Sequence, residues 1–201
     1  MTSSELPISL KTVTGPDLSD YVPALAALRT EVFREWPYLY DGDADYEERY
    51  LQTYVNSPGA VVVLALAEEE VVGAATGLPL VDETDEFTQP FLDHGYDPSA
   101  VFYCAESVLR RAYRGRGLGG RFFDERERHA RTLGGFRYSC FCRVDRPADH
   151  PDRPADYVPL DGFWRRRGYT EHTELQTHYG WRDIGALESS DKPMVFWLKA
   201  L

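Results

Sequence analysis

A glycine-rich turn follows an apolar stretch in the middle of the chain. It reads Tyr-Arg-Gly-Arg-Gly-Leu-Gly-Gly over residues 113–120, between the strand-like run Val101–Leu109 and the helical pattern Leu118–Leu133. Glycines permit left-handed backbone angles, so several N–H groups can converge on one anion. The first N–H groups of a helix have no internal partner, and the helix dipole adds partial positive charge there. The turn therefore predicts a diphosphate site, with further charge from Arg114, Arg116 and Arg121.

The spacing of the glycines separates the families that use such turns. A Walker loop needs Gly-x-x-x-x-Gly-Lys-Ser/Thr and a dinucleotide fingerprint needs Gly-x-Gly-x-x-Gly, and neither fits in context. The pattern Arg-x-x-Gly-x-Gly does occur, at Arg114, Gly117 and Gly119. It resembles the pyrophosphate-binding motif of the GNAT N-acetyltransferase superfamily, which usually follows a strand and an aromatic residue such as Tyr113.

A second stretch carries the same resemblance. Residues 161–169 read Asp-Gly-Phe-Trp-Arg-Arg-Arg-Gly-Tyr, which is similar to the second GNAT signature, and the two signatures stand in the expected order and separation. The resemblance extends over residues 8–198. It implies an α/β (α+β) fold with a mixed, mostly antiparallel sheet of six to seven strands, splayed at its centre and covered by helices on both faces. It also implies one domain, residues 1–201, with acetyl-CoA as co-substrate.

The resemblance implies which residues hold acetyl-CoA. In the family, the strand before the glycine turn separates from its neighbour, and its freed backbone groups bind the pantetheine arm. The glycine turn anchors the diphosphate, and the helix of the second signature closes the cleft. By position, the cofactor-binding residues here are Ser107, Val108, Leu109, Arg110, Arg114, Gly115, Arg116, Gly117, Leu118, Gly119, Gly120 and Trp164.

Glu106 is the one carboxylate in an otherwise apolar strand. Burial of a glutamate has no packing advantage, and desolvation raises the pKa of a carboxyl group. We therefore predict that Glu106 is the general base, because an amine with a pKa of ~10.4 arrives protonated and must lose a proton before it attacks. His150 is a rival base, since its ordinary pKa lies near neutrality. A structural alternative places Glu106 at the solvent end of the strand, or in an ion pair with Arg110 or Arg137.

The sequence leaves open which residue protonates the departing CoA thiolate, because the tyrosine common in the second signature is replaced by Trp164. An indole N–H donates a hydrogen bond but releases no proton at physiological pH. Tyr157 is our first candidate and Ser139 the second. In a third alternative no acid is used, since a thiolate with a pKa of about 8.5 is a tolerable leaving group.

Two loops are predicted to contact the acceptor. In GNAT proteins the first two helices and the loop between them form one wall of the acceptor site, which implies Trp36, Tyr38, Tyr40 and Asp41 here. A second loop, residues 143–157, is rich in proline, aspartate and arginine and should be rigid; its candidates are Arg143 and His150. The first loop suggests a cationic amine and the second a carboxylate-bearing one, so the small-molecule or peptide acceptor stays open.

Two functions from different classes follow. The first is transfer of an acetyl group from acetyl-CoA to a primary amine, by direct attack within a ternary complex. The second is a non-catalytic acyl-CoA-binding sensor or partner module, which the missing tyrosine favours. Release of free thiol in the presence of acetyl-CoA and an amine separates them.

Composition and sequence patterns argue against disorder, nucleic-acid binding, a membrane span and a metal site. Hydrophobic residues make up 43% of the 201 residues, which argues against disorder. The net charge of −11 makes nucleic acid an unexpected partner. No run reaches the ~20 apolar residues of a membrane span, and the start lacks a signal-peptide pattern, so we expect a cytoplasmic protein with no membrane partner. The spacing of the three cysteines predicts buried thiols. We expect no metal site. A homodimer is possible, as in relatives.

Periodicity predicts the elements that must position these residues. Alternating or continuous apolar runs predict strands at 8–13, 60–67, 71–80, Val101–Leu109, 136–144, 169–181 and 193–198. Apolar residues at helical spacing predict helices at 17–36, 46–55, 87–92, Leu118–Leu133 and 160–168.

Overall fold

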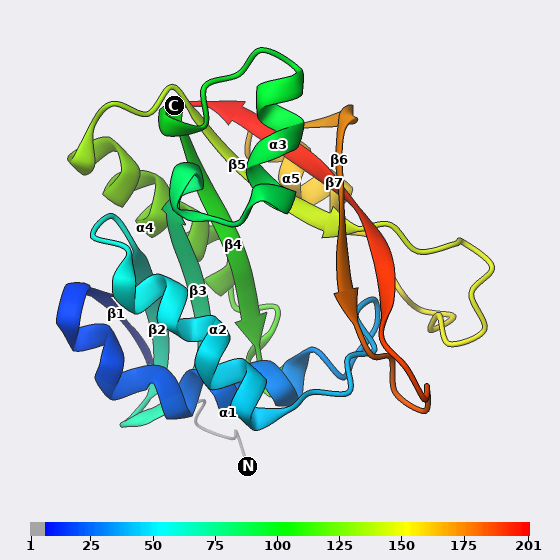
Figure 1. The fold of residues 1–201 in the computed structure, drawn as a ribbon. Helices are drawn as coiled ribbons and strands as arrows, with labels where there is room; N and C mark the ends of the chain where they lie inside the picture. Colours follow the sequence, from blue (N-terminus) through cyan, green and yellow to red (C-terminus); the bar gives the residue numbers. More distant parts are fainter. Residues whose placement is uncertain (1–6) are drawn as a thin grey trace.

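The strands pair into one sheet in the computed structural model, which describes residues 7–201. These residues form a seven-stranded sheet in the order β1-β2-β3-β4-β5-β7-β6 (Figure 1). The neighbours β4 and β5 run parallel, and the other pairs are antiparallel. The predicted α/β fold with a mixed, mostly antiparallel sheet is confirmed. The strands are β1 Ile8–Thr14, β2 Val61–Ala67, β3 Glu70–Pro79, β4 Val101–Leu109, β5 Tyr138–Val144, β6 Thr170–Trp181 and β7 Ser190–Ala200.

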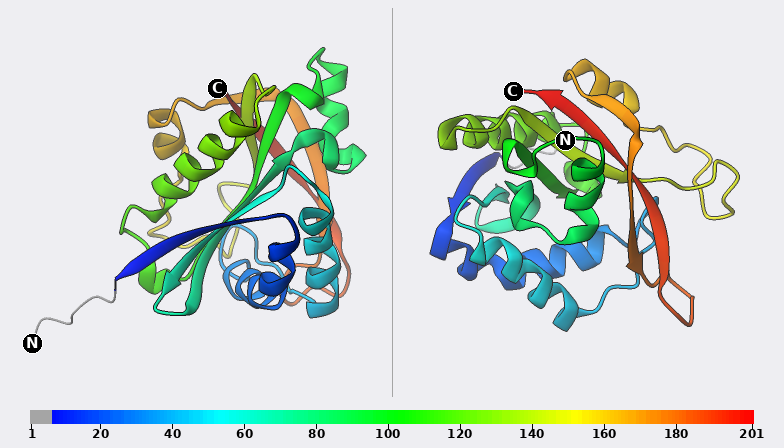
Figure 2. Two further views of the ribbon diagram at one scale, coloured as in Figure 1. Left: turned by 90° about the vertical axis from the view of Figure 1, so that its left-hand side faces the viewer. Right: turned by 45° about the horizontal axis from the view of Figure 1, so that its top comes forward.

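Helices cover both faces of the sheet, as expected (Figure 2). One face carries α1, α2 and α3, and the other carries α4 and α5. Successive strand residues point to opposite faces, so in β4 Tyr103 packs beneath α1 to α3, whereas Phe102 and Cys104 pack beneath α4. The α-helices are α1 Val22–Val32, α2 Ala44–Asn56, α3 Asp85–Asp93, α4 Leu118–Leu133 and α5 Asp161–Arg166, and the short 3-10 helices are Gly15–Tyr21, Leu80–Asp82, Pro98–Ala100 and Arg111–Tyr113.

The first helical region is divided, and the prediction of one helix over 17–36 was wrong. Residues Gly15–Tyr21 form a 3-10 helix, and α1 begins afterwards at Val22. Pro23, at the start of α1, has no N–H to donate to the carbonyl four residues earlier, so the α-helical ladder starts anew there. α1 ends at Val32. The loop that follows, residues 33–43, is here called the aromatic loop and is longer than predicted.

The strands β4 and β5 separate after a short pairing. Their paired residues are Val101 with Tyr138, Phe102 with Ser139 and Tyr103 with Cys140. Beyond these, β4 continues to Leu109 and β5 to Val144, and the two strands do not pair with each other again in the described chain. The predicted splay at the centre of the sheet is confirmed. The edge of β4 that faces this gap has no strand beside it, so its backbone groups are open to a ligand except where an arginine side chain already binds a carbonyl, as Arg114 does at Leu109.

A β-bulge in β4 changes which side chains face each helix layer. Thr76 pairs with Glu106 and Leu78 with Tyr103, so β4 advances by three residues where β3 advances by two. One extra residue in a strand reverses the direction of the side chains that follow it. Glu106 consequently points toward α1 to α3 and Ser107 toward α4.

Candidate active site

The glycine turn leads from β4 into α4 with the backbone angles that the motif requires. Gly115 and Gly117 have φ of 78° and 76°, and Gly117 is the N-cap of α4. The added Cβ atom of an alanine would meet nothing within 4 Å at either position, so glycine is needed for its backbone angles rather than for space. Because α4 starts at Leu118, the N–H groups of its first turn have no partner within the helix. The turn is thus a concentrated source of backbone donors.

The side chains near the turn already have protein partners. Arg114 donates from Nε to the Leu109 carbonyl (3.0 Å) and from Nη1 to Glu35 (2.7 Å). Arg110 forms ion pairs with Glu31 and Glu70. The guanidinium of Arg116 lies 5.2 Å from the centre of the Tyr113 ring. The arginine side chains near the turn are therefore held in place by glutamate side chains, backbone carbonyls and an aromatic ring.

The end of β4 is fixed by a buried arginine from the opposite helix layer. Arg126 of α4 is 1% exposed and donates to the carbonyls of Thr76 (3.1 Å) and Glu106 (2.8 Å). It also donates to the Ser107 hydroxyl (3.0 Å). A bulge disrupts the local hydrogen-bond ladder, and this guanidinium supplies the missing donors. Arg126 therefore stabilises the backbone angle that directs Glu106.

A cavity of about 590 Å³ lies on the other face of the sheet, beneath α1 to α3. This cavity reaches the gap between the splayed strands, where Ala105 and Glu106 of β4 and Cys142 of β5 line it. Its volume falls within the range of small-molecule sites. The remaining lining residues are Arg29, Phe33, Tyr38, Tyr40, Asp41, Asp43, Tyr46, Arg49, Tyr50, Phe87, Tyr103, Tyr179, Gly180, Trp181, Arg182, Leu187, Ser189 and Met194.

Glu106 belongs to a buried charge triad at the inner end of this cavity. Arg29 of α1 forms ion pairs with both Glu106 and Glu47. The side chains of Arg29 and Glu47 are 7% and 0% exposed, and that of Glu106 is 12% exposed. The guanidinium also lies 4.3 Å from the centre of the Tyr50 ring. The predicted burial of Glu106 is confirmed, but its alternative partners Arg110 and Arg137 were wrong: the partner is Arg29.

A third carboxylate, Glu83, lies behind the aromatic wall of the cavity. Burial raises the pKa of Glu83 to about 7. Burial is also the main cause of the raised pKa values of Tyr50, Tyr54 and Tyr103, and the charge of Glu83 adds to each. Ionisation of Glu83 therefore affects the environment of the cavity.

We expect this carboxyl group to make stability depend on pH. Its pKa rises from 4.5 to about 7 on folding, so the native state binds more protons than the unfolded state between these values. The free energy of unfolding should therefore fall as pH rises from 4.5 to 7, by at most about 3 kcal/mol from this group, and level off above. Urea unfolding across this range should show a shallower slope for Glu83→Gln than for the unmodified protein. Equal slopes would contradict the buried position of Glu83.

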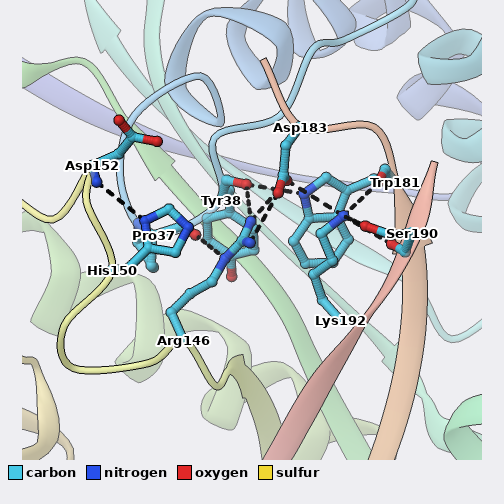
Figure 3. Close-up of polar contacts among 9 residues, drawn as sticks. All are labelled: Pro37, Tyr38, Arg146, His150, Asp152, Trp181, Asp183, Ser190 and Lys192. Carbon is cyan, nitrogen blue, oxygen red and sulfur yellow. Dashed lines mark hydrogen bonds and ion pairs between the residues drawn. The ribbon is translucent and has the colours of Figure 1, made fainter. Parts of the chain in front are cut away.

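Arg146 joins three separate segments into the outer wall of the cavity (Figure 3). Its guanidinium binds both carboxylate oxygens of Asp183 (3.0 and 2.8 Å) and donates to the carbonyls of Pro37 (2.9 Å) and Tyr38 (2.8 Å). The Tyr38 carbonyl also accepts from Trp181 Nε1 (2.9 Å). Bidentate arginine–carboxylate pairs fix orientation as well as charge. The aromatic loop, the loop after β5 and the β6–β7 hairpin therefore form one unit.

The residues predicted to contact substrate are divided between the cavity and its surroundings. Tyr38 and Tyr40 line the cavity. Trp36, His150 and Arg143 lie outside its lining: Trp36 packs against the His150 ring at 5.1 Å, and Arg143 binds Asp145 and Glu171. In the structure, the latter three residues support the loops rather than the cavity surface.

The candidates for the proton donor lie apart from the cavity lining and from one another. Tyr157 lies 5.9 Å from the Trp36 ring, outside the cavity lining, and burial raises its pKa. Ser139 is fully buried and hydrogen-bonds to the Tyr169 hydroxyl (2.8 Å). Trp164 of α5 packs against Phe141 (4.9 Å) on the α4 face of the sheet.

The sequence reasoning missed Arg29, Glu47 and Arg126. Arg29 is four residues from both Leu25 and Phe33, so a charge stood within the predicted apolar stripe of a helix. Such a charge needs a buried partner, and that signal could have pointed to the triad. The aromatic residues of β6 that line the cavity gave no comparable signal, because their pattern is that of any half-buried strand.

Two features are absent from the part of the chain that the structure describes. No group of three or more His, Cys, Asp or Glu side chains in residues 7–201 is arranged to hold a metal ion. Within the same part of the chain, no helix has the length and apolar character needed to cross a membrane. The three cysteines are free and buried, as predicted.

Comparisons with known proteins agree with this geometry. Residues 25–152 match the model of the acetyltransferase (GNAT) family. No curated protein matches the sequence. The structure is similar to ribosomal-protein-alanine N-acetyltransferase from Brucella melitensis, with 16% identity, coverage of 96% of this chain and 99% of that chain, and a TM-score of 0.62. It is also similar to Arabidopsis thaliana NAA60 in complex with acetyl-CoA, with 15% identity, coverage of 97% and 99%, and a TM-score of 0.62.

An acetyltransferase from Thermus thermophilus shares 18% identity, with 98% of each chain covered and a TM-score of 0.56. Structural similarity at such low sequence identity shows a shared fold and no more. The family model covers more than half of the chain, including β4, the glycine turn and α4. The chain therefore belongs to the acetyltransferase (GNAT) family.

Proposed function

We propose that this protein transfers an acetyl group from acetyl-CoA to a primary amine of a small molecule or peptide. The observation that supports this proposal is the meeting of two sites at one gap in the sheet. The glycine turn lies at the start of α4 on one face, and the acceptor cavity lies on the other. Ala105 and Cys142 line the cavity from the two strands that separate there.

The residues around the turn fit the diphosphate of coenzyme A. Left-handed glycines and the unpaired N–H groups of α4 supply donors for an anion. The edge of β4 that no longer pairs with β5 after Tyr103 would bind the pantetheine arm. The proposed cofactor-binding residues are those predicted from sequence, at the end of β4 and just after it (107–110), in the turn (114–120) and at Trp164. Acetyl-CoA supplies the acetyl group as a thioester, which the amine attacks directly within a ternary complex.

Glu106 is the proposed proton acceptor for the incoming ammonium group. Its carboxylate lines the cavity beside Ala105, at the gap where the two substrates would meet. The guanidinium of Arg29 forms an ion pair with this carboxylate and holds it at the inner end of the cavity. Fixing both substrates at this gap should supply much of the rate acceleration.

The first test concerns the turn. We expect Gly117→Val to weaken coenzyme A binding at least roughly tenfold, because a β-branched residue at φ of 76° costs about 1–2 kcal/mol and displaces the first turn of α4. Gly95→Val is the matched control, since Gly95 has the same φ of 76° and equal space at the end of α3. Calorimetry with coenzyme A measures both. Equal affinities of the two variants would count against the proposed diphosphate site.

The second test concerns the thiolate. Tyr157 stays the proposed proton donor, because burial raises its pKa and keeps the hydroxyl protonated. We expect Tyr157→Phe to lower kcat at least roughly tenfold without changing the affinity for coenzyme A. Unchanged turnover would mean that the thiolate leaves without this proton.

A non-catalytic acyl-CoA-binding module is the second candidate, because the ring of Trp164 packs against Phe141 and Trp197 where many relatives have a catalytic tyrosine. Coenzyme A binding without thiol release on any amine would favour it. A homodimer and a cytoplasmic location stay predictions from the sequence.

A further inference from the structure

The inner end of the acceptor cavity carries an excess of negative charge. Two carboxylates, Glu106 and Glu47, share the single guanidinium of Arg29. The Oε2 atom of Glu106 is buried and has no hydrogen-bond partner within residues 7–201. A buried carboxylate oxygen without a donor is stabilised by an incoming N–H group. This end of the cavity therefore suits an ammonium group and repels a carboxylate attached close to it.

The walls of the cavity present ring surface rather than free polar groups. Nine of its 21 lining residues are aromatic, so aromatic rings form a large share of the surface available to a ligand. Several tyrosine hydroxyls are already used within the protein: Tyr46 bonds to Tyr179, Tyr50 to Tyr54 and Tyr103 to Cys142. Aromatic faces attract cations and pack against apolar or aromatic bodies. The walls thus suit a ring-bearing body and offer few hydrogen bonds to a polyol.

The acids at the opening of the cavity are not available to a second ammonium group. Asp41 is bound by Arg34 (3.2 Å) and by Arg182 (2.8 Å). Asp43 caps α2 by accepting from the Tyr46 backbone N–H (2.8 Å). The exposed Arg49 lines the same opening and adds positive charge, while the guanidinium of Arg182 is held beside Asp41. A diamine would place its second charge beside these arginines.

From these three observations we infer that the acceptor is a primary monoamine carried on an apolar, ring-bearing body, an arylalkylamine in chemical class. Its ammonium group lies at the inner end beside Glu106, and its rings pack between α2 and β6 against Tyr46 and Tyr179. This inference rests on the proposed acetyl transfer and specifies the acceptor that the same cavity takes.

The test compares probes that differ in one feature. Tryptamine and 2-phenylethylamine carry one amine on a ring. L-Phenylalanine adds a carboxylate beside the amine of 2-phenylethylamine, and 1,4-diaminobutane replaces the ring with a second amine. We expect kcat/KM, followed by thiol release from acetyl-CoA, to be at least about tenfold higher for the two arylalkylamines. Calorimetry in the absence of acetyl-CoA should give the same order of affinities.

A pair of variants tests the ring wall itself. Tyr46→Leu should raise KM for tryptamine about five- to tenfold and leave KM for acetyl-CoA unchanged. Tyr96→Leu is the control, because Tyr96 packs against Phe91 and does not line the cavity. Equal effects of the two variants would overturn the assignment of the ring wall.

The outcomes separate this inference from the function on which it rests. Efficient thiol release with diaminobutane, phenylalanine or a short peptide, and none with arylalkylamines, would overturn the acceptor class and leave acetyl transfer standing. Failure of coenzyme A to bind would overturn the proposed function itself. Cofactor binding without release on any probe would overturn both the acceptor class and catalysis.

Discussion

Replacing Glu106 by glutamine will lower kcat by about 10²- to 10⁴-fold, which is the usual contribution of a general base. Glutamine has nearly the shape of glutamate and keeps an oxygen for Arg29, but it cannot accept a proton at neutral pH. The affinity for coenzyme A should not change, because the glycine turn lies outside the triad. Thiol release under saturating acetyl-CoA measures kcat, and calorimetry measures the affinity.

A pH series distinguishes a base from a residue that only supports the cavity. As pH approaches the pKa of the acceptor amine, ~10.4 for an alkylamine, more of it arrives without its extra proton and needs no base. The difference between Glu106→Gln and the unmodified enzyme should therefore shrink as pH rises. Glu125→Gln, at a partly exposed acid paired with Arg128 on α4, is the control and should retain full activity. A constant deficit at every pH would show that Glu106 is not the proton acceptor.

Replacing Arg29 by methionine will lower the free energy of unfolding by about 3–5 kcal/mol. Methionine fills much of the volume of arginine, but it leaves Glu47 and Glu106 buried side by side without a cation. Two carboxylates in that position repel each other as well as lacking solvent. Urea unfolding at neutral pH measures the loss.

Two further variants show whether the buried charges cause this loss. Arg34→Met removes an arginine whose side chain is 49% exposed and whose partner is Asp41, so it should cost no more than about 1 kcal/mol. The double variant Arg29→Met with Glu47→Gln should recover part of the stability, since one unpaired carboxylate is gone. Similar losses for Arg29→Met and Arg34→Met would indicate that the triad contributes little.

Secondary structure was largely predictable because local signals agreed with the final packing. β4 and α4 have the predicted bounds, since a mostly apolar run before a glycine-rich turn and an amphipathic repeat with a glycine stop each allow one interpretation. The first helix failed because Pro23 interrupts a repeat whose apolar spacing continues through it. Periodicity records which face is buried, and it does not record a lost hydrogen-bond donor.

The composition of the site was less predictable than its position. The turn could be located because the left-handed angles of Gly115 and Gly117 require glycine, which is visible in the sequence. The direction of Glu106 depends on a bulge, and regular alternation would have placed its side chain with Cys104, beneath α4. A one-residue shift in register arises from pairing between strands, so no local pattern reports it. The role of Arg126 follows from the same bulge and was hidden for the same reason.

The position of the gap between β4 and β5 has a consequence for the order of events in turnover. The glycine turn opens toward the α4 face, whereas the acceptor cavity opens among α1, α2 and the β6–β7 hairpin. For the proposed transfer, each ligand would therefore have its own entrance, and the two routes would meet at the gap between β4 and β5. Either product could then depart while the other is still held, without crossing the path of its counterpart.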